Sequence, residues 1–173
     1  EISKQEHFDK IIIIPSNMPP HKNVERNDPA QRMEMARLAF PEYEVSDIEL
    51  RRGGKSYTCD TLAELKKQYP EGTLCLICGS DMFKTLPKWR SPERIFQLAQ
   101  VVTAARDKRD QWRLRLAKLW YRLRYGAVCR IVKLDPIVIS SSEIRLSGLE
   151  GEDISQWVLP DVYEYIVKNG LYR

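Results

Sequence analysis

The sequence has very few histidines and no long apolar run. Only two of its 173 residues are histidine, at positions 7 and 21, which excludes a metal centre that the chain itself builds from three histidines. No stretch approaches the run of about 18 apolar residues that a membrane-spanning helix needs. Internal repeats and low-complexity segments are also missing. Apolar residues at 43% and charged residues at 30% are ordinary for a globular protein and exclude a disordered chain.

The net charge of +4 is concentrated in one region. Residues 106–130 hold nine basic and two acidic side chains, a local charge of +7, so the rest of the chain is slightly acidic. This distribution excludes a uniformly basic nucleic-acid-binding protein. We interpret residues 111–124 as an amphipathic helix with a solvated cationic face. The alternatives are attraction of phosphorylated substrates and a contact between subunits. Apolar side chains at helical spacing are expected to pack inward, namely Trp112, Leu116, Leu119, Trp120 and Leu123.

The four cysteines include a CxxC pair, Cys75 and Cys78. Both lie inside the apolar run 74–78, which is typical of a buried strand. Residues three apart on a strand point to opposite faces, so this pair is not expected to hold one metal ion. Cysteines used as small buried apolar residues favour a reduced, intracellular location, and we expect a cytoplasmic protein.

Strand and helix patterns alternate along the chain. Strands are expected at 11–14, 43–50, 74–78, 101–105, 131–134 and 137–139. Helices are expected after Asp28, at 62–69, after Ser91, at 111–124, from Ser141 or Ser142, and from Pro160. The alternation predicts an α/β fold with a mainly parallel sheet and helices on both faces, in one domain over residues 1–173. Ligands in such folds bind beyond the carboxyl ends of the strands.

Two of the expected strand ends carry polar groups suited to a ligand. Residues 15–22 form a proline-stiffened loop that ends in His21 and Lys22, which are cationic or hydrogen-bonding. Gly79 lets a ligand approach the backbone after the strand 74–78, and Asp81 can accept hydrogen bonds from ribose hydroxyls.

Three further segments offer recognition chemistry. Trp89 lies outside any periodic pattern, and its ring can stack on a flat, cationic heterocycle. Ser141, Ser142 and Arg145 open a helix and resemble a phosphate cradle made of backbone N–H groups, hydroxyls and a guanidinium. Residues 56–58, which include Tyr57 and Thr58, precede a helix and can present backbone N–H groups to a small anion such as a carboxylate.

These motifs, taken in order, resemble bacterial nicotinate-nucleotide adenylyltransferases. Each motif is weak alone, but the ordered set is specific and spans nearly the whole chain. The matching segments are Pro15…Pro19-Pro20-His21-Lys22, Ser56-Tyr57-Thr58 followed by Asp60-Thr61-Leu62, Gly79-Ser80-Asp81, Leu86-Pro87-Lys88-Trp89, Ile139-Ser140-Ser141-Ser142-Glu143-Ile144-Arg145 and Tyr165-Ile166…Gly170-Leu171-Tyr172.

The resemblance implies a Rossmann-like nucleotidyltransferase fold and a reaction in NAD biosynthesis. AMP would pass from ATP to nicotinate mononucleotide, giving deamido-NAD and pyrophosphate with Mg²⁺. Trp89 would stack on the pyridine ring, Thr58 and its neighbours would hold the carboxylate, and Asp81 would lie near the ribose. The phosphates would be held by Ser141, Ser142 and Arg145, with Lys22 and His21 nearby. No nucleophilic side chain is required, and none is assigned.

The sequence departs from the family pattern at three places. The family's Arg-Pro-Gly turn is replaced by residues 106–108, and Arg90 stands where an aromatic residue is common. The family's N-terminal GGxFDPxHxGH loop has no counterpart, and the chain starts at Glu1. We therefore expect the sequence to be N-terminally incomplete by roughly 25 residues, the size of a strand, a loop and most of a helix. Without the two histidines of that loop, little or no transfer is expected.

Several alternatives stay open at this point. A related nucleotidyltransferase could use nicotinamide mononucleotide or another phosphorylated acceptor, such as phosphopantetheine. A non-catalytic nucleotide-binding module is a second alternative, and nucleic-acid binding by residues 106–130 is a weaker third. We expect ATP and nicotinate mononucleotide as ligands and no nucleic-acid or membrane partner. A homo-oligomer is one alternative for the assembly of the chain.

Overall fold

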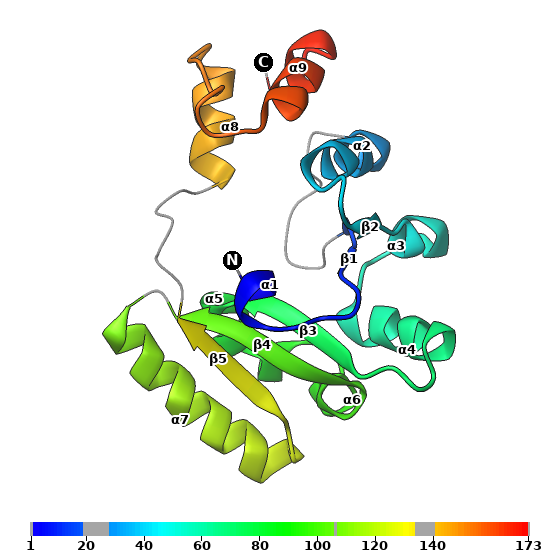
Figure 1. Cartoon of the computed structure of the whole chain (residues 1–173), viewed down its shortest axis with the longest axis vertical. Helices are drawn as coiled ribbons and strands as arrows, with labels where there is room; N and C mark the ends of the chain where they lie inside the picture. Colours follow the sequence, from blue (N-terminus) through cyan, green and yellow to red (C-terminus); the bar gives the residue numbers. More distant parts are fainter. Residues whose placement is uncertain (1, 19–27, 106, 134–140, 173) are drawn as a thin grey trace. The chain divides into compact units, whose positions relative to one another are not determined.

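A computed structural model describes residues 2–18, 28–105, 107–133 and 141–172 of the chain (Figure 1). The chain divides into two compact units, which are described separately below. Unit 1 comprises Glu1–Phe8 and Tyr57–Pro136, and unit 2 comprises Asp9–Ser56 and Ile137–Arg173. No helix within the described ranges has the length and apolar character needed to cross a bilayer.

Unit 1 contains a three-stranded parallel sheet in the order β3-β4-β5. Its strands are β3 (Leu74–Gly79), β4 (Ala99–Ala105) and β5 (Cys129–Lys133). Leu76 lies opposite Val101, which in turn lies opposite Cys129. β4 is the best-buried strand because it is paired on both edges. Every strand pair among the described residues is parallel, as the alternation of strands and helices predicts.

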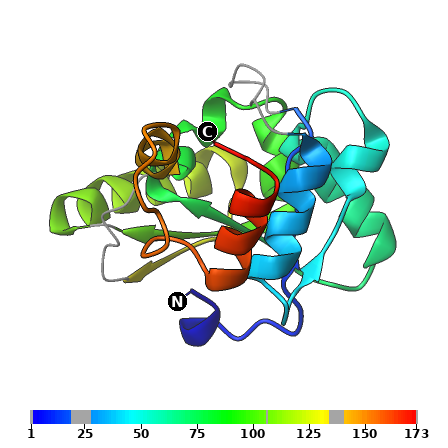
Figure 2. The same ribbon diagram turned by 90° about the horizontal axis from the view of Figure 1, so that it is seen from above.

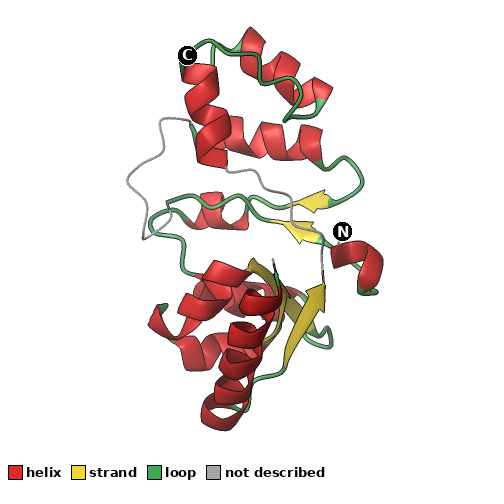
Figure 3. Ribbon diagram, turned by 90° about the vertical axis from the view of Figure 1, so that its left-hand side faces the viewer, coloured by secondary structure: helices red, strands yellow, loops and turns green. Residues whose placement is uncertain are grey.

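Helices connect these strands and pack on their sheet (Figure 3). The core beneath the sheet joins Phe83 and Leu86 with Leu114 and Tyr121, all almost completely buried. The Tyr121 hydroxyl donates a 2.7 Å hydrogen bond to the Phe83 carbonyl, so this buried polar group is satisfied. The helices of unit 1 are α1 (Ile2–Gln5), α4 (Thr58–Gln68), α5 (Ser80–Thr85), the 3₁₀ helix η1 (Leu86–Lys88), α6 (Pro92–Leu98) and α7 (Lys108–Tyr125).

The inward packing predicted for the apolar stripe of α7 is wrong. α7 instead buries a different arc, which includes Leu114 and Tyr121, and the five side chains of the predicted stripe are exposed. The physical reason is that α7 has two apolar arcs on opposite sides, and the arc with Tyr121 fits the ring of Phe96 at a centroid distance of 5.1 Å. The exposed side chains are Trp112, Leu116, Leu119, Trp120 and Leu123.

Unit 2 pairs two short parallel strands, β1 (Ile12–Ile13) and β2 (Glu44–Val45). Its helices α2 (Pro29–Ala39) and α9 (Pro160–Lys168) lie side by side (Figure 2). A small core forms around Val162 and Ile166 of α9, with Met35 and Leu38 of α2 packed against it. The remaining helices of unit 2 are α3 (Ile48–Arg52) and α8 (Ser141–Leu149).

Several predicted element boundaries need correction. The strand predicted at 43–50 is strand only at β2, because α3 begins at Ile48 and buries Ile48 and Glu49. α4 begins at Thr58, four residues before the predicted start. The N-cap predicted at Asp28 is confirmed, since its carboxylate accepts a 2.9 Å hydrogen bond from the Ala30 N–H. The strand predicted at 137–139 lies outside the described residues.

Candidate functional site

The N-terminus of α4 lies level with the carboxyl end of β3. α4 has 11 residues and β3 has six, which correspond to lengths of about 16 Å and 20 Å. A five-residue turn, 69–73, joins them, and the two elements pack against each other in opposite directions. The start of α4 therefore lies at the sheet edge where ligands bind in parallel α/β folds.

Tyr57 and Thr58 open α4 with backbone N–H groups for which the described residues provide no acceptor. The first N–H groups of a helix have no partner within it, and the N-cap residue Tyr57 makes no side-chain capping bond. The dipole of an 11-residue helix adds partial positive charge at the same place. The structure thus provides, at Tyr57 and Thr58, the kind of donor group that the sequence predicts for a small anion.

Trp89 lies directly after η1 in the same unit. Its half-buried ring packs against the main core and also against a second cluster of buried residues. Its Nε1–H points to the Thr85 hydroxyl at 3.4 Å, which helps to fix the ring. Tyr57 packs against the same second cluster, so the structure brings two of the predicted residues to one apolar surface. This cluster consists of Cys59, Leu62, Ile95 and Ala99.

Arg90, which stands where the family commonly has an aromatic residue, also belongs to this group. Its guanidinium lies 4.4 Å from the centroid of the Tyr57 ring, a cation–π contact. It also lies 3.6 Å from the Asp60 carboxylate in the first turn of α4. A cation is therefore held beside the donors at the start of α4. Its position directly after Trp89 is the sequence signal that could have assigned it to the site.

Gly79 and Asp81 lie where β3 passes into α5. A Cβ added at Gly79 would meet no atom within 4 Å, so a ligand has room to approach this backbone. The exposed Asp81 carboxylate is 2.9 Å from the Lys84 ammonium. Lys84 also binds Asp110 at 3.0 Å, and its hydrogen bond to Asp81 is the main cause that raises its pKa. Lys84 is a site residue that the motifs did not indicate, although its position three residues after Asp81 on a helix predicts such a pair.

The predicted phosphate-binding residues belong to unit 2 or lie outside the described residues. Ser141 and Ser142 are exposed at the start of α8, and an Arg145 Nη atom lies 3.4 Å from the Ser142 hydroxyl. The structure thus brings Ser142 and Arg145 together on one helix face. His21 and Lys22 lie outside the described residues.

The loop that leads toward residues 21 and 22 is firmly anchored where the structure describes it. The Ser56 hydroxyl accepts hydrogen bonds from the N–H groups of Asn17 and Met18 at 2.9 and 3.3 Å. The guanidinium of Arg32 donates to the carbonyls of Ser16 and Asn17. The Ser56 N–H in turn donates a 2.9 Å hydrogen bond to the Met18 carbonyl. Of the N–H groups expected at residues 56–58, that of Ser56 therefore holds this loop and is not available to a ligand.

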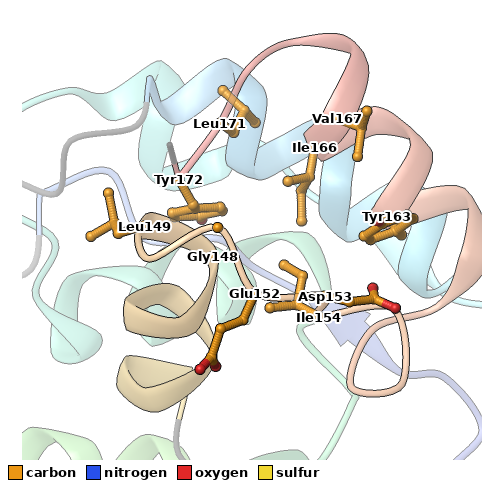
Figure 4. A pocket seen from close by; sticks show the side chains of 11 residues that line it. Gly148, Leu149, Glu152, Asp153, Ile154, Tyr163, Ile166, Val167, Leu171 and Tyr172 are labelled. Carbon is orange, nitrogen blue, oxygen red and sulfur yellow. The ribbon is translucent and has the colours of Figure 1, made fainter.

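Unit 2 also contains a pocket of about 430 Å³ (Figure 4). Its lining includes apolar side chains of α9 and the acidic residues Glu152 and Asp153. Hydrogen bonds from the Ser155 N–H and hydroxyl lower the pKa of Asp153, so this carboxylate stays charged. None of the described residues that line the pocket is a cation or a predicted site residue, so this lining is poorly suited to an anionic nucleotide.

Comparisons with known proteins identify the kind of protein. A cytidylyltransferase-like family matches residues 3–147. A probable nicotinate-nucleotide adenylyltransferase of Lachnoclostridium phytofermentans is 33% identical over 98% of this chain and 86% of its own length. A probable nicotinate-nucleotide adenylyltransferase of Citrifermentans bemidjiense is 38% identical over 93% of this chain and 82% of its own length. The Plasmodium falciparum nicotinic acid mononucleotide adenylyltransferase complexed with NaAD has a similar fold, with a TM-score of 0.73 at 18% identity over 99% of this chain and 86% of its own.

The parallel α/β fold, the polar groups at its strand ends and the cytidylyltransferase-like match define a nucleotidyltransferase. Relatives more than 30% identical over nearly the whole chain narrow this class further. The chain belongs to the nicotinate-nucleotide adenylyltransferase family.

Proposed function

We propose that this protein transfers the adenylyl group of ATP to nicotinate mononucleotide, giving deamido-NAD and pyrophosphate. The observation that carries the proposal is the grouping of Tyr57, Trp89 and Arg90 beside the N-terminus of α4. A pyridinium ring with a carboxylate needs an aromatic face, N–H donors and a cation. All three occur here in one unit.

The nicotinate group is assigned to this cluster. The Trp89 ring stacks on the cationic pyridine ring, an interaction worth on the order of 1 kcal/mol. The backbone N–H groups at Tyr57 and Thr58 bind the carboxylate, and Arg90 adds a charge of the right sign. The amide of nicotinamide mononucleotide carries no negative charge, so the same groups favour the acid.

The ribose is assigned to Gly79 and Asp81. The open space at Gly79 admits the sugar, and the Asp81 carboxylate accepts hydrogen bonds from its hydroxyls. The Lys84 ammonium lies 2.9 Å from one oxygen of that carboxylate. This ion pair limits the rotamers of Asp81 before substrate binds, which lowers the entropic cost of binding.

The phosphates are assigned to Ser141, Ser142 and Arg145, together with His21 and Lys22. Hydroxyls and N–H groups at the start of α8, with the guanidinium of Arg145, match the chemistry of a phosphate site. Within the described ranges no three His, Cys, Asp or Glu side chains cluster to hold a metal. Mg²⁺ is proposed to arrive on the ATP phosphates, where it neutralises charge.

The proposed reaction needs no covalent intermediate with the protein. A phosphate oxygen of nicotinate mononucleotide forms a bond to the α-phosphorus of ATP, and the bond from that phosphorus to the pyrophosphate oxygen breaks. The protein contributes by holding both substrates in line and by stabilising the developing charge.

We place the reaction in the cytoplasm, where ATP is available and the four cysteines stay reduced. A homo-oligomer stays a prediction.

The direct test is product formation by protein expressed from the complete reading frame. Incubation with ATP and nicotinate mononucleotide should release pyrophosphate and deamido-NAD in equal amounts, measured by mass spectrometry. A non-catalytic nucleotide-binding module would bind ATP and release no pyrophosphate. A nucleotidyltransferase with another acceptor would release pyrophosphate only with that acceptor.

A further inference from the structure

On the side opposite its buried face, α7 presents a line of apolar side chains that stays exposed among the described residues. Trp112, Leu116, Leu119 and Leu123 follow one another at intervals of four, three and four residues, which places them on one line of the helix surface. Their side chains are 65%, 55%, 54% and 77% exposed. Soluble proteins rarely expose a continuous apolar line of this kind without a partner.

Positive charge flanks this apolar line on both sides. Six basic side chains of α7 are exposed, and none of them forms an ion pair with a described carboxylate. The one carboxylate within α7, Asp110, is buried on the opposite face and bound to Lys84. The outer face of α7 therefore combines large apolar side chains with uncompensated positive charge. The six basic residues are Arg109, Arg113, Arg115, Lys118, Arg122 and Arg124.

We propose that α7 docks unit 1 onto an anionic lipid surface. An interfacial helix lies in the membrane plane, with Trp and Leu side chains among the acyl chains and Arg and Lys among the phosphate headgroups. The outer face of α7 has this composition and order. Its inner face is held by Leu114 and Tyr121 in the core of unit 1, so the helix is already formed before docking. Docking therefore does not require the folding that a disordered anchor undergoes.

A second copy of the chain fits this face less well. The spacing of the apolar line matches that of a short coiled coil, in which two copies of α7 would pack along this line. However, Arg113, Arg115 and Arg122 lie beside the line. Two copies of α7 would bring these like charges together. A nucleic acid would pair with the arginines but would leave the leucine line without an apolar partner. The earlier expectation of no membrane partner rested on the missing spanning segment, which does not bear on surface docking.

Vesicle sedimentation tests the proposal with the full chain. Vesicles containing phosphatidylglycerol should sediment the protein, and pure phosphatidylcholine vesicles should not. Leu116→Glu combined with Leu123→Glu should weaken binding at least tenfold. The matched control is Leu146→Glu on α8, since Leu146 is 57% exposed and lies outside α7, and it should change binding less than twofold. The thermal midpoint of the double variant should equal that of the parent chain, because both leucines face outward.

Four results would overturn the proposal. The first is no sedimentation with the anionic vesicles at low salt, and the second is equal binding by the double variant. The third is equally strong binding to vesicles of pure phosphatidylcholine and to the anionic vesicles, which would show that the basic side chains do not contribute. A dimer that forms without lipid and dissociates in the double variant would identify a second copy as the occupant. Adenylyl transfer in solution does not involve this face, so the two proposals can fail separately.

Discussion

At the scale of single residues, Trp89 is the side chain on which the proposed substrate recognition most depends. Trp89→Leu keeps apolar bulk between the two clusters that Trp89 contacts and removes the aromatic face. Loss of about 1 kcal/mol of stacking predicts a rise of about fivefold in KM for nicotinate mononucleotide. KM for ATP should stay unchanged. Trp112→Leu, at an exposed tryptophan of α7, is the control and should leave both values unaltered.

Lys84 gives a second residue-level prediction through its ion pairs with Asp81 and Asp110. The pKa of Lys84 is raised above 10.5, so its contribution to stability is complete below that pH and is lost as the pH rises through the raised value. Lys84→Met should therefore lower the free energy of unfolding near pH 8. The difference from the parent chain should narrow in strongly alkaline buffer. Urea titrations at several pH values measure the difference in free energy of unfolding between the two chains. If that difference did not change with pH, the ion pairs of Lys84 would not be its source.

The sequence predicted some of these residues and missed others for a physical reason. Trp89 was recognised because it lies outside any apolar period, and Asp81 because it follows a buried strand. Arg90 and Lys84 act through contacts that only the fold creates, one over the Tyr57 ring and the other between two carboxylates. Exposed basic residues are common in this sequence, so residue type alone does not mark these two.

At the scale of secondary structure, local signals predicted α2 and α7 but not which face of α7 packs. Periodicity locates an apolar arc, and α7 has two of them on opposite sides. The choice depends on the fit of Leu114 and Tyr121 to the core beneath the sheet, which is a tertiary property. The predicted strand at 43–50 was wrong for a related reason, because burial of Ile48 and Glu49 occurs in a helix there.

The N-cap of α2 provides a prediction at this scale. Asp28→Ala removes the acceptor for the Ala30 N–H and should lower the free energy of unfolding by about 1 kcal/mol. Asp28→Ser keeps a capping oxygen and should retain most of the stability. Urea denaturation followed by circular dichroism measures both variants. Equal stability of the parent, Ala and Ser chains would show that the cap contributes nothing.

At the scale of the whole molecule, buried ionisable groups in unit 1 predict sensitivity to alkali. Burial raises the pKa of Cys78 from 9.0 to about 12 and that of Cys129 to about 11. An unfolded thiol ionises near pH 9 while the folded one stays neutral, so unfolding releases a proton and stability falls as pH rises from about 9 toward 12. One thiol contributes a slope of about 1.4 kcal/mol per pH unit. Cys78→Ala should make the measured slope shallower, and an unchanged slope would contradict this account.

The uneven distribution of charge along the sequence is explained by where the helices lie in the fold. The local charge of +7 in residues 106–130 belongs mainly to α7, whereas the proposed nicotinate cluster lies at the start of α4. The sequence motifs predicted the family and the parallel α/β fold, because those motifs follow strand ends in a fixed order. The outward surface of α7 could not be predicted, since it depends on the packing of the entire unit.

The ratio of kcat/KM for nicotinate mononucleotide to that for nicotinamide mononucleotide tests the central claim most directly. It should be measured by ATP-dependent pyrophosphate release with protein from the complete reading frame. The N–H donors at the start of α4 and the Arg90 cation predict a ratio of at least tenfold in favour of the acid. Arg90→Gln should reduce the ratio and leave kcat unchanged. A ratio below one, with the amide preferred, would contradict the assignment of this site.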